Sequence, residues 1–129
     1  MPGAPTTTEA ALLGLLALEG ERSPYDLVKA IQGSIGYFFA PARSHVYDVL
    51  PRMERLGWVR HREVAQAGRP DKRVYRVTAG GRAVLVSWLA ADDDPGEDRG
   101  VLLLKLYCGA LIAPERSAER LEAVRARAR

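Results

Sequence analysis

The sequence predicts a mainly α-helical domain that carries one small β-hairpin, an α+β fold class. Apolar residues recur every three or four positions through most of the chain, which is the spacing of one face of a helix. Within residues 58–77, two short runs rich in Val, Trp and Tyr flank a turn sequence with glycine and proline. At 129 residues and 47% apolar composition, the chain can form one packed domain, or one small domain with an appendage.

Two helices are expected first. Thr8 can cap the first, which spans Thr8–Glu19 and is apolar nearly all round, so we expect it to be buried. Gly20 ends this helix. Ser23 caps the second, over Pro24–Gly33, where proline occupies the favoured first position. The aromatic, glycine-containing residues 34–41 then form a packed turn.

The third helix, at residues 43–56, has one apolar and one basic face, and Gly57 ends it. Its expected core stripe is Val46, Val49, Leu50, Met53 and Leu56. Its outer face carries Arg43, His45, Tyr47, Asp48, Arg52 and Arg55. Pro51 lies inside the helix, where proline removes a backbone hydrogen bond, so we expect a kink between Tyr47 and Pro51.

The hairpin at residues 58–77 follows directly. Gly68–Lys72 is its expected turn, and Trp58 and Tyr75 are expected in its core. Thr78 then caps a fourth helix that continues to Ala90. A helix with a basic outer face followed at once by a basic hairpin is the working part of a winged helix-turn-helix, so residues 8–90 are predicted to form such a DNA-binding domain.

Positive charge is concentrated in this part of the chain. Residues 43–82 hold ten basic and four acidic side chains, a net of +6, whereas the remainder has a net of −3 within a total of +3. Such clustering favours a polyanionic partner, here double-stranded DNA, although a solvated basic face without a partner is the alternative.

Residues 91–99 are acidic and rich in helix breakers, and are predicted to be a solvated linker; they lack the spacing of a calcium-binding loop. Residues 100–129 form two further helices, Val101–Ile112 and one that starts at Ala113–Glu115. They carry more leucine than two short helices can bury. A C-terminal dimerisation region is therefore expected, with help from the first helix, which makes the protein a homodimer.

Several classes are excluded by the sequence. Cys108, His45 and His61 lack the spacing of a metal site, and no catalytic, phosphate-binding or dinucleotide-binding motif is present, so we expect no enzyme, metal or cofactor. The single cysteine and the absence of a signal sequence or of an apolar run long enough to span a membrane predict a cytoplasmic protein without membrane contact.

Three segments resemble the PadR-like family of transcriptional regulators: the early Leu-Leu-Gly-Leu-Leu-Ala-Leu helix with the Pro-Tyr-Asp-Leu start of the next, Ser44 to Gly57, and Gly68 to Arg82. Residues 97–112 are similar to the dimerisation region of the branch that includes the virulence activator alpha type. The chain departs from the family in having Asp48 where proline is usual, and in stopping early, which implies a short or truncated C-terminal region.

The expected mode of binding places helix 43–56 in the major groove and the hairpin in the adjacent minor groove. The residues expected to contact DNA are Arg43, Ser44, His45, Tyr47, Arg52, Arg69, Lys72 and Arg73. The resemblance implies contacts from Ser44 and Tyr47; a core aromatic is the alternative for Tyr47. Arg69 is expected at the hairpin tip, and Arg52 near phosphates or Glu54.

The resemblance also implies a repressor that a small aromatic or drug-like effector releases from DNA. The two-fold symmetry of the expected dimer predicts an inverted-repeat operator. Apolar surface around Trp88, Leu103 and Tyr107 is the candidate effector pocket. Two alternatives stay open: a winged-helix module that binds protein instead of DNA, and a truncated regulator impaired in dimerisation.

Overall fold

The computed structural model describes residues 3–93 and 96–128, except for the side chains at positions 111 and 128. Asp94 and Pro95 of the predicted linker, the first two residues and Arg129 therefore lie outside the described residues. The elements, in order, are α1 (Thr7–Glu19), α2 (Pro24–Gly33), α3 (Arg43–Arg55), β1 (Val59–Gln66), β2 (Arg69–Val77), α4 (Ala79–Ala90), α5 (Arg99–Ile112) and α6 (Pro114–Ala128). The predicted α+β class is confirmed.

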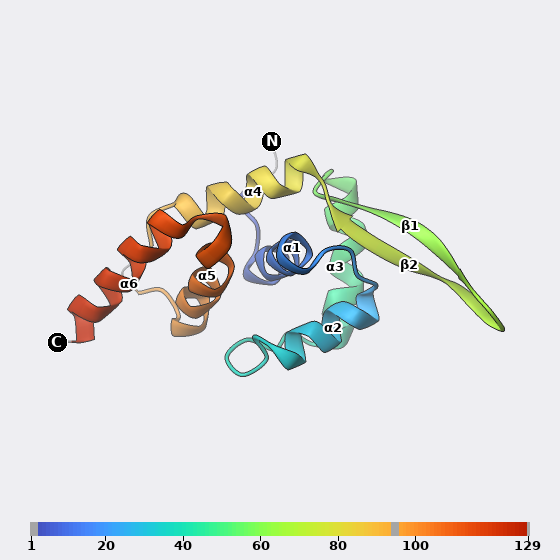
Figure 1. The fold of residues 1–129 in the computed structure, drawn as a ribbon, viewed down its shortest axis with the longest axis horizontal. Coiled ribbons are helices and arrows are strands. Elements are labelled where there is room, and N and C mark those ends of the chain that lie inside the picture. Colours follow the sequence, from blue (N-terminus) through green and yellow to red (C-terminus); the bar gives the residue numbers. More distant parts are fainter. Residues whose placement is uncertain (1–2, 94–95, 129) are drawn as a thin grey trace.

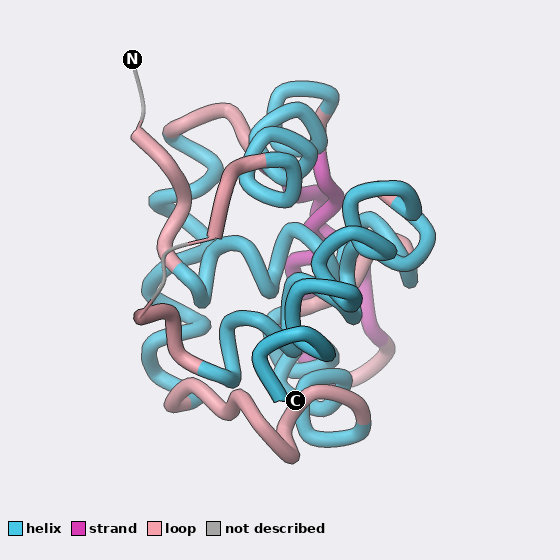
Figure 2. Tube along the Cα trace, turned by 90° about the vertical axis from the view of Figure 1, so that its left-hand side faces the viewer, coloured by secondary structure: helices cyan, strands magenta, loops and turns pink. Residues whose placement is uncertain are grey.

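Helix α1 lies at the centre of the molecule, with the other helices around it (Figure 1). The hairpin projects at one end and α6 lies at the other (Figure 1). Seen from the α6 end, the helices stand in front of the two strands (Figure 2). Ala11, Leu12, Leu13 and Leu15 of α1 are at most 1% exposed, which confirms the expectation of a buried first helix.

The prediction of Thr8 as the α1 cap is wrong, because Thr6 is the cap. The Thr6 backbone N–H donates to Glu9 Oε1 at 2.7 Å, and the Glu9 N–H donates to Thr6 Oγ1 at 3.2 Å. This reciprocal pair needs a carboxylate three positions after the cap, and only Thr6 has one. Gly20 ends α1 as expected, with a φ of 86°.

Helix α3 buries Val46, Val49, Leu50 and Met53 and continues through Pro51 without interruption. Leu56 is wrongly assigned to the core, since it is 40% exposed. Leu56 is the C-terminal cap of α3. The helix ends at this position, so the apolar stripe does not continue to it.

Strands β1 and β2 pair in antiparallel order from Val59 opposite Val77 to Gln66 opposite Arg69. The turn is therefore Ala67–Gly68, with Gly68 at a φ of 69°, and not the five residues predicted. The N–H groups of Arg22 and Tyr75 each donate to the other's carbonyl, at 3.0 and 2.8 Å. The α1–α2 connection thus meets β2 in one isolated antiparallel bridge. Trp58 and Tyr75 are buried, as predicted.

The N-terminus of α4 packs closely against the base of the hairpin. Thr78 caps it, with its Oγ1 accepting from the Gly81 N–H at 3.0 Å. A Cβ atom on Gly81 would lie 2.0 Å from the Trp58 carbonyl oxygen, whereas one on Gly80 would meet nothing closer than 3.4 Å. Gly81 is therefore needed for close approach, and Gly80 is not.

The core extends beyond Ala90. Leu104 and Cys108 of α5 are fully buried in the same cluster as the α1 leucines, so the protein's own body covers part of the leucine surface that the sequence assigns to a second subunit. Tyr107 and Leu121 remain 37% and 40% exposed.

The description of the acidic stretch as solvated is wrong for Asp93, whose side chain is only 9% exposed. Its carboxylate accepts from Lys105 Nζ at 2.9 Å and from Arg120 Nε at 2.9 Å. Lys105 also bonds Glu97 at 3.0 Å. Burial opposes ionisation of Asp93, but these two cations outweigh it and hold its pKa below the ordinary value. This acidic stretch anchors α5 and α6.

Candidate nucleic-acid interface

The outer face of α3 is open to solvent over its first two turns. Arg43, Ser44, His45 and Tyr47 are all exposed, as residues off the buried stripe of an amphipathic helix must be. Tyr47 is 42% exposed, which contradicts the alternative that it is a core aromatic. The N-terminal half of α3 is therefore free to meet a partner, and in its second half Arg52 and Arg55 are also exposed.

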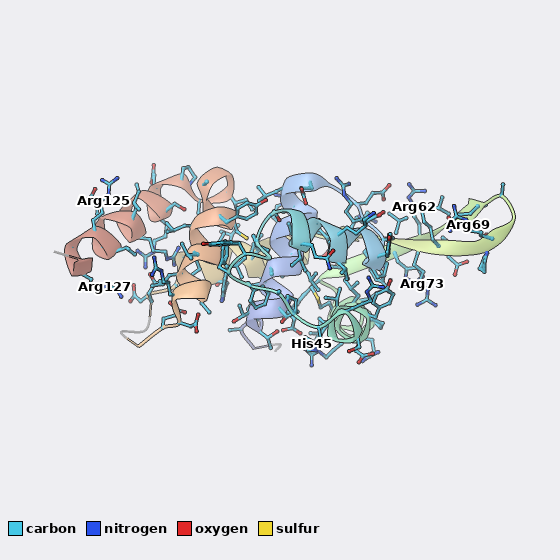
Figure 3. All side chains as sticks on the ribbon, turned by 90° about the horizontal axis from the view of Figure 1, so that it is seen from below. His45, Arg62, Arg69, Arg73, Arg125 and Arg127 are labelled. Carbon is cyan, nitrogen blue, oxygen red and sulfur yellow. The ribbon has the colours of Figure 1, made fainter. Side chains whose placement is uncertain are left out.

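A groove of about 750 Å³ separates this helix from the hairpin. It brings together four of the predicted contacts, Tyr47, Arg69, Lys72 and Arg73. Pro24, Pro51 and Tyr75 are also among its lining residues. Figure 3 shows Arg69 and Arg73 along the hairpin, with Arg73 nearer the helices. Because residues of both α3 and the hairpin line the groove, one ligand can touch both.

The other four predicted contacts do not line this groove. Arg43 and Ser44 lie on the exposed start of α3, and Arg43 lines a separate small hollow beside α2. His45 lines a separate hollow with Phe38, Phe39 and Asp98, where α3 begins beside the start of α5. Arg52 Nη2 pairs with Glu9 Oε2 at 2.5 Å rather than with Glu54, and the Glu9 side chain is only 5% exposed. Arg52 thus neutralises the carboxylate that caps α1, which is a structural role that the sequence analysis missed.

The base of the hairpin is fixed to the helices by two carboxylates. Glu54 of α3 accepts from the His61 backbone N–H at 3.1 Å and lies 2.7 Å from His61 Nδ1. Burial opposes ionisation of Glu54, but the His61 hydrogen bonds and charge prevail and lower its pKa. Glu21, in the α1–α2 connection, takes a two-pronged contact from Arg62 of β1. Together these contacts hold the base of the hairpin to α3 and to the α1–α2 connection.

Tyr25 of α2 is a further residue of this groove, with Lys29 beside its ring, and neither is among the contacts predicted from the sequence. Tyr25 lines the groove and is 48% exposed. Lys29 Nζ and Arg43 Cζ lie 5.1 and 5.8 Å from the centre of its ring. The only sequence signal is that Tyr25 and Lys29 fall off the apolar stripe of α2.

The three candidate effector residues do not share one hollow. Trp88 lines a hollow of about 410 Å³ with Gly3, Ala4 and Pro5 of the N-terminal segment, and neither Leu103 nor Tyr107 lines it. Lys105 Nζ lies 5.2 Å from the centre of the Trp88 ring. Leu103 and Tyr107 are each two residues from Lys105 in the sequence. Two residues correspond to about 200° around a helix axis, so both side chains lie on the face of α5 opposite Lys105.

Within the described residues, no group of three or more His, Cys, Asp or Glu side chains could hold a metal ion. Cys108 is buried, and this burial raises the pKa of its thiol to about 12. It is a packing residue rather than a reactive one. In the same described part, no helix has the length and apolarity to cross a membrane.

Comparison with known proteins identifies the family. The model of the transcriptional regulator PadR-like family matches residues 12–87, which is more than half of the chain. The chain belongs to the PadR-like family. The matched region contains α2, α3 and both strands, so the groove lies within it. The members of this family are transcriptional regulators and not enzymes.

Two curated relatives are described as transcriptional regulators. A Mycobacterium tuberculosis protein described as a probable transcriptional regulator, Rv1176c, is 42% identical over 77 residues, which is 60% of this chain and 41% of the relative. The negative transcriptional regulator PadR of Bacillus subtilis is 30% identical over 98 residues, 75% of this chain and 53% of its own. The chain thus spans about half the length of these relatives.

Solved structures confirm the winged-helix fold. The crystal structure of Bacillus subtilis PadR in complex with operator DNA superposes with a TM-score of 0.66 at 25% identity, over 88% of this chain and 64% of that chain. The PadR-like regulator BC1756 from Bacillus cereus gives a TM-score of 0.59 at 22% identity, over 95% of this chain and 69% of that one.

Proposed function

We propose that this chain is a sequence-specific DNA-binding regulator that places α3 in the major groove and the β1–β2 hairpin in the minor groove. The observation that carries this proposal is the groove, because it joins Tyr47 of α3 to Arg69, Lys72 and Arg73 of the hairpin. Residues 43–82 carry a net charge of +6, and phosphate neutralisation supplies much of the affinity of DNA-binding proteins. The solved complex of a PadR relative with operator DNA supports the same reading.

In this arrangement the exposed N-terminal half of α3, with Arg43, Ser44 and His45, reaches base edges and flanking phosphates. Arg69 is the first residue of β2 after the two-residue turn and enters the minor groove, where a narrow groove attracts arginine. Arg52 contributes less, because Glu9 already takes part of its charge.

We further propose a homodimeric repressor that binds an inverted repeat. Tyr107 and Leu121 are exposed apolar side chains on α5 and α6, and a second copy covering them would continue the packing of the C-terminal helices. The description of the Bacillus subtilis relative as a negative regulator supports repression. Sedimentation of the chain tests the dimer: the mass of two chains is expected, and a monomer at micromolar concentration contradicts it.

A small aromatic effector is proposed to release the DNA, as suggested by a solved complex of Bacillus subtilis PadR with p-coumaric acid. The hollow beside Trp88 and the surface near Tyr107 are the two places to test. Binding of p-coumaric acid should quench tryptophan fluorescence in the wild type and not in Trp88→Phe if the first place is used. Unchanged fluorescence and unchanged DNA affinity would remove the effector from the proposal.

The test of DNA binding is titration of a labelled random duplex with the chain at several salt concentrations. Steeply salt-dependent binding is expected, and charge reversal in Arg69→Glu with Lys72→Glu should weaken it strongly. Arg125→Glu with Arg127→Glu, at the opposite end of the molecule (Figure 3), makes the same charge change and should matter far less. Absence of binding at low salt contradicts the proposal and favours a protein-binding module.

A further inference from the structure

The base of the hairpin is attached to the rest of the molecule on both of its faces. On one face, Glu54 of α3 accepts from the His61 backbone N–H at 3.1 Å and lies 2.7 Å from His61 Nδ1. On the other face, Arg62 contacts Glu21 of the α1–α2 connection, since successive residues of a strand point to opposite sides. Beyond these contacts the hairpin projects away from the helices (Figure 1).

The two attachments differ in how they respond to pH. The guanidinium of Arg62 stays charged at all physiological pH values, and its hydrogen bond lowers the pKa of Glu21. That pair therefore keeps both charges. Burial opposes ionisation of Glu54, but its hydrogen bonds to His61 lower its pKa, so it is ionised as well. Histidine, by contrast, changes its charge between about pH 5 and 8.

Protonation of His61 strengthens its contact with Glu54. An ionised carboxylate only accepts hydrogen bonds, so Nδ1 carries a proton in either charge state of the ring. A second proton, on the other ring nitrogen, gives the ring a positive charge that attracts the carboxylate. The two side chains are only 27% and 29% exposed, so solvent screens this attraction in part and not completely.

Other groups near His61 act on this contact in opposite directions. The Tyr75 ring lies opposite on β2, with its centre 5.5 Å from that of the imidazole. Glu63 follows on the same face of β1 and pairs in register with Arg73. Arg73 favours the ionised form of Glu54 and repels a protonated ring, whereas Glu63 attracts one. Among the described residues, Glu54 alone is hydrogen-bonded to the ring, so its charge prevails.

We propose that Glu54 and His61 are positioning residues that set the hairpin beside α3 and hold it more firmly when His61 is protonated. The inference rests on the DNA-binding function proposed above and adds a pH-dependent control of it. From His61 to the end of β1 at Gln66 is about 17 Å along the strand, so a rotation of ~10° at the base displaces the tip by about 3 Å. Such a displacement moves Arg69 away from its place on the DNA. A hairpin held in place beforehand loses less conformational freedom on binding.

The first experiment measures the affinity of the full chain for a labelled random duplex at about pH 5.5 and 7.5, within the range where histidine changes its charge. The chain has two histidines, so the measurements use a His45→Gln background in which only His61 remains. Affinity should be about two- to fivefold higher at the lower pH, the range expected for a partly exposed ion pair.

Glu54→Gln keeps an oxygen for the His61 N–H but removes the negative charge, so it should abolish most of this pH dependence. His61→Gln should do the same. Glu21→Gln is the matched control, because it neutralises the carboxylate on the opposite face of the hairpin and should keep the pH dependence. Circular dichroism and the melting temperature establish that each variant is folded.

The second experiment needs no DNA. Spin labels on Ala67→Cys at the turn and Ala90→Cys at the end of α4 measure the position of the hairpin relative to the helices. Both positions are exposed, and Cys108 is buried away from the label. The distribution of distances between the labels should be narrower at about pH 5.5 than at pH 7.5. In Glu54→Gln it should be broad at both.

The two experiments separate this inference from the proposed function. If the distribution is the same at both pH values, or if Glu54→Gln keeps the wild-type pH dependence, the positioning role is overturned while DNA binding stands. If the distribution narrows at low pH but the folded chain fails to bind DNA at low salt, the hairpin is positioned as proposed and the DNA-binding function fails.

Discussion

The helical body and the C-terminal helix α6 are held by different forces. In α1, the residues from Thr8 to Leu16 are buried, and all but Thr8, Glu9 and Gly14 of these are apolar. In α6, the one described side chain that is fully buried is that of Arg120, which reaches Asp93 and the Ala91 carbonyl. Hydrophobic packing thus makes the body, whereas the one fully buried side chain of α6 is held by the Arg120–Asp93 ion pair, so we expect loss of this pair to act locally.

The largest expected effect comes from removing Asp93. Asp93→Ala leaves Arg120 and Lys105 buried without their shared partner, and breaking such a buried pair costs about 3–5 kcal/mol. We expect the amides of α6 to exchange with deuterium far faster while those of α1 stay protected. Asp92→Ala is the control, because Asp92 is fully exposed. Equal protection of α6 in both variants would contradict the ionic docking of this helix.

A pair of glycines tests packing inside the body. Gly81→Ala forces a methyl group against the Trp58 carbonyl oxygen, and such overpacking costs about 1–3 kcal/mol. Gly80→Ala, one position earlier, has room and should raise the free energy of unfolding by up to about 1 kcal/mol through helix propensity. Chemical denaturation of the two variants measures the difference, and an equal change in both would show that the close approach is unimportant.

The smallest expected effect is the loss of stability of the Asp93 cluster when the pH is lowered. The pKa of Asp93 is lowered in the folded state, so its stabilising contribution is complete above its ordinary pKa of about 3.8 and is lost as the pH falls through the lower folded value. Asp93, Glu97, Lys105 and Arg120 are the charged groups of this cluster. Trp88 lies beside Lys105. As the pH is lowered, the fluorescence of Trp88 should therefore change at a higher pH than the fluorescence of buried Trp58 does.

Single-tryptophan variants, Trp58→Phe and Trp88→Phe, separate these two signals. Asp93→Asn should abolish the early Trp88 transition and leave that of Trp58 in place. A common midpoint for both tryptophans would mean that body and C-terminal helices unfold together, which the different bonding of the two regions does not predict.

The same difference explains what the sequence could predict. Periodic apolar residues and local caps determine the body, so the second, third and fourth helices have nearly their predicted bounds. Three consecutive threonines could each cap α1, and only the three-residue spacing from Thr6 to Glu9 identifies Thr6 as the cap. The ion pairs of Asp93 join residues 12 and 27 positions away, and such pairs leave no periodic pattern.

The candidate interface follows the same rule. The sequence could predict four residues of the groove, because α3 and the hairpin are adjacent in the chain and the spacing of apolar residues identifies the exposed face of each. These residues are Tyr47, Arg69, Lys72 and Arg73. Tyr25 could not, because its place beside Arg43 depends on how α2 packs against α3. The pairing of Arg52 with Glu9 spans 43 residues and likewise appears only once the chain is folded.

The most direct measurement of the proposed function is selection of binding sites from a pool of random duplexes by the full chain. A dimeric winged-helix regulator should enrich an inverted repeat whose half-sites lie about one helical turn, ~34 Å, or a multiple of it apart. The enriched sites should be lost from the selection with Arg69→Glu and Lys72→Glu. A pool that stays random through repeated rounds would contradict sequence-specific DNA binding by this chain.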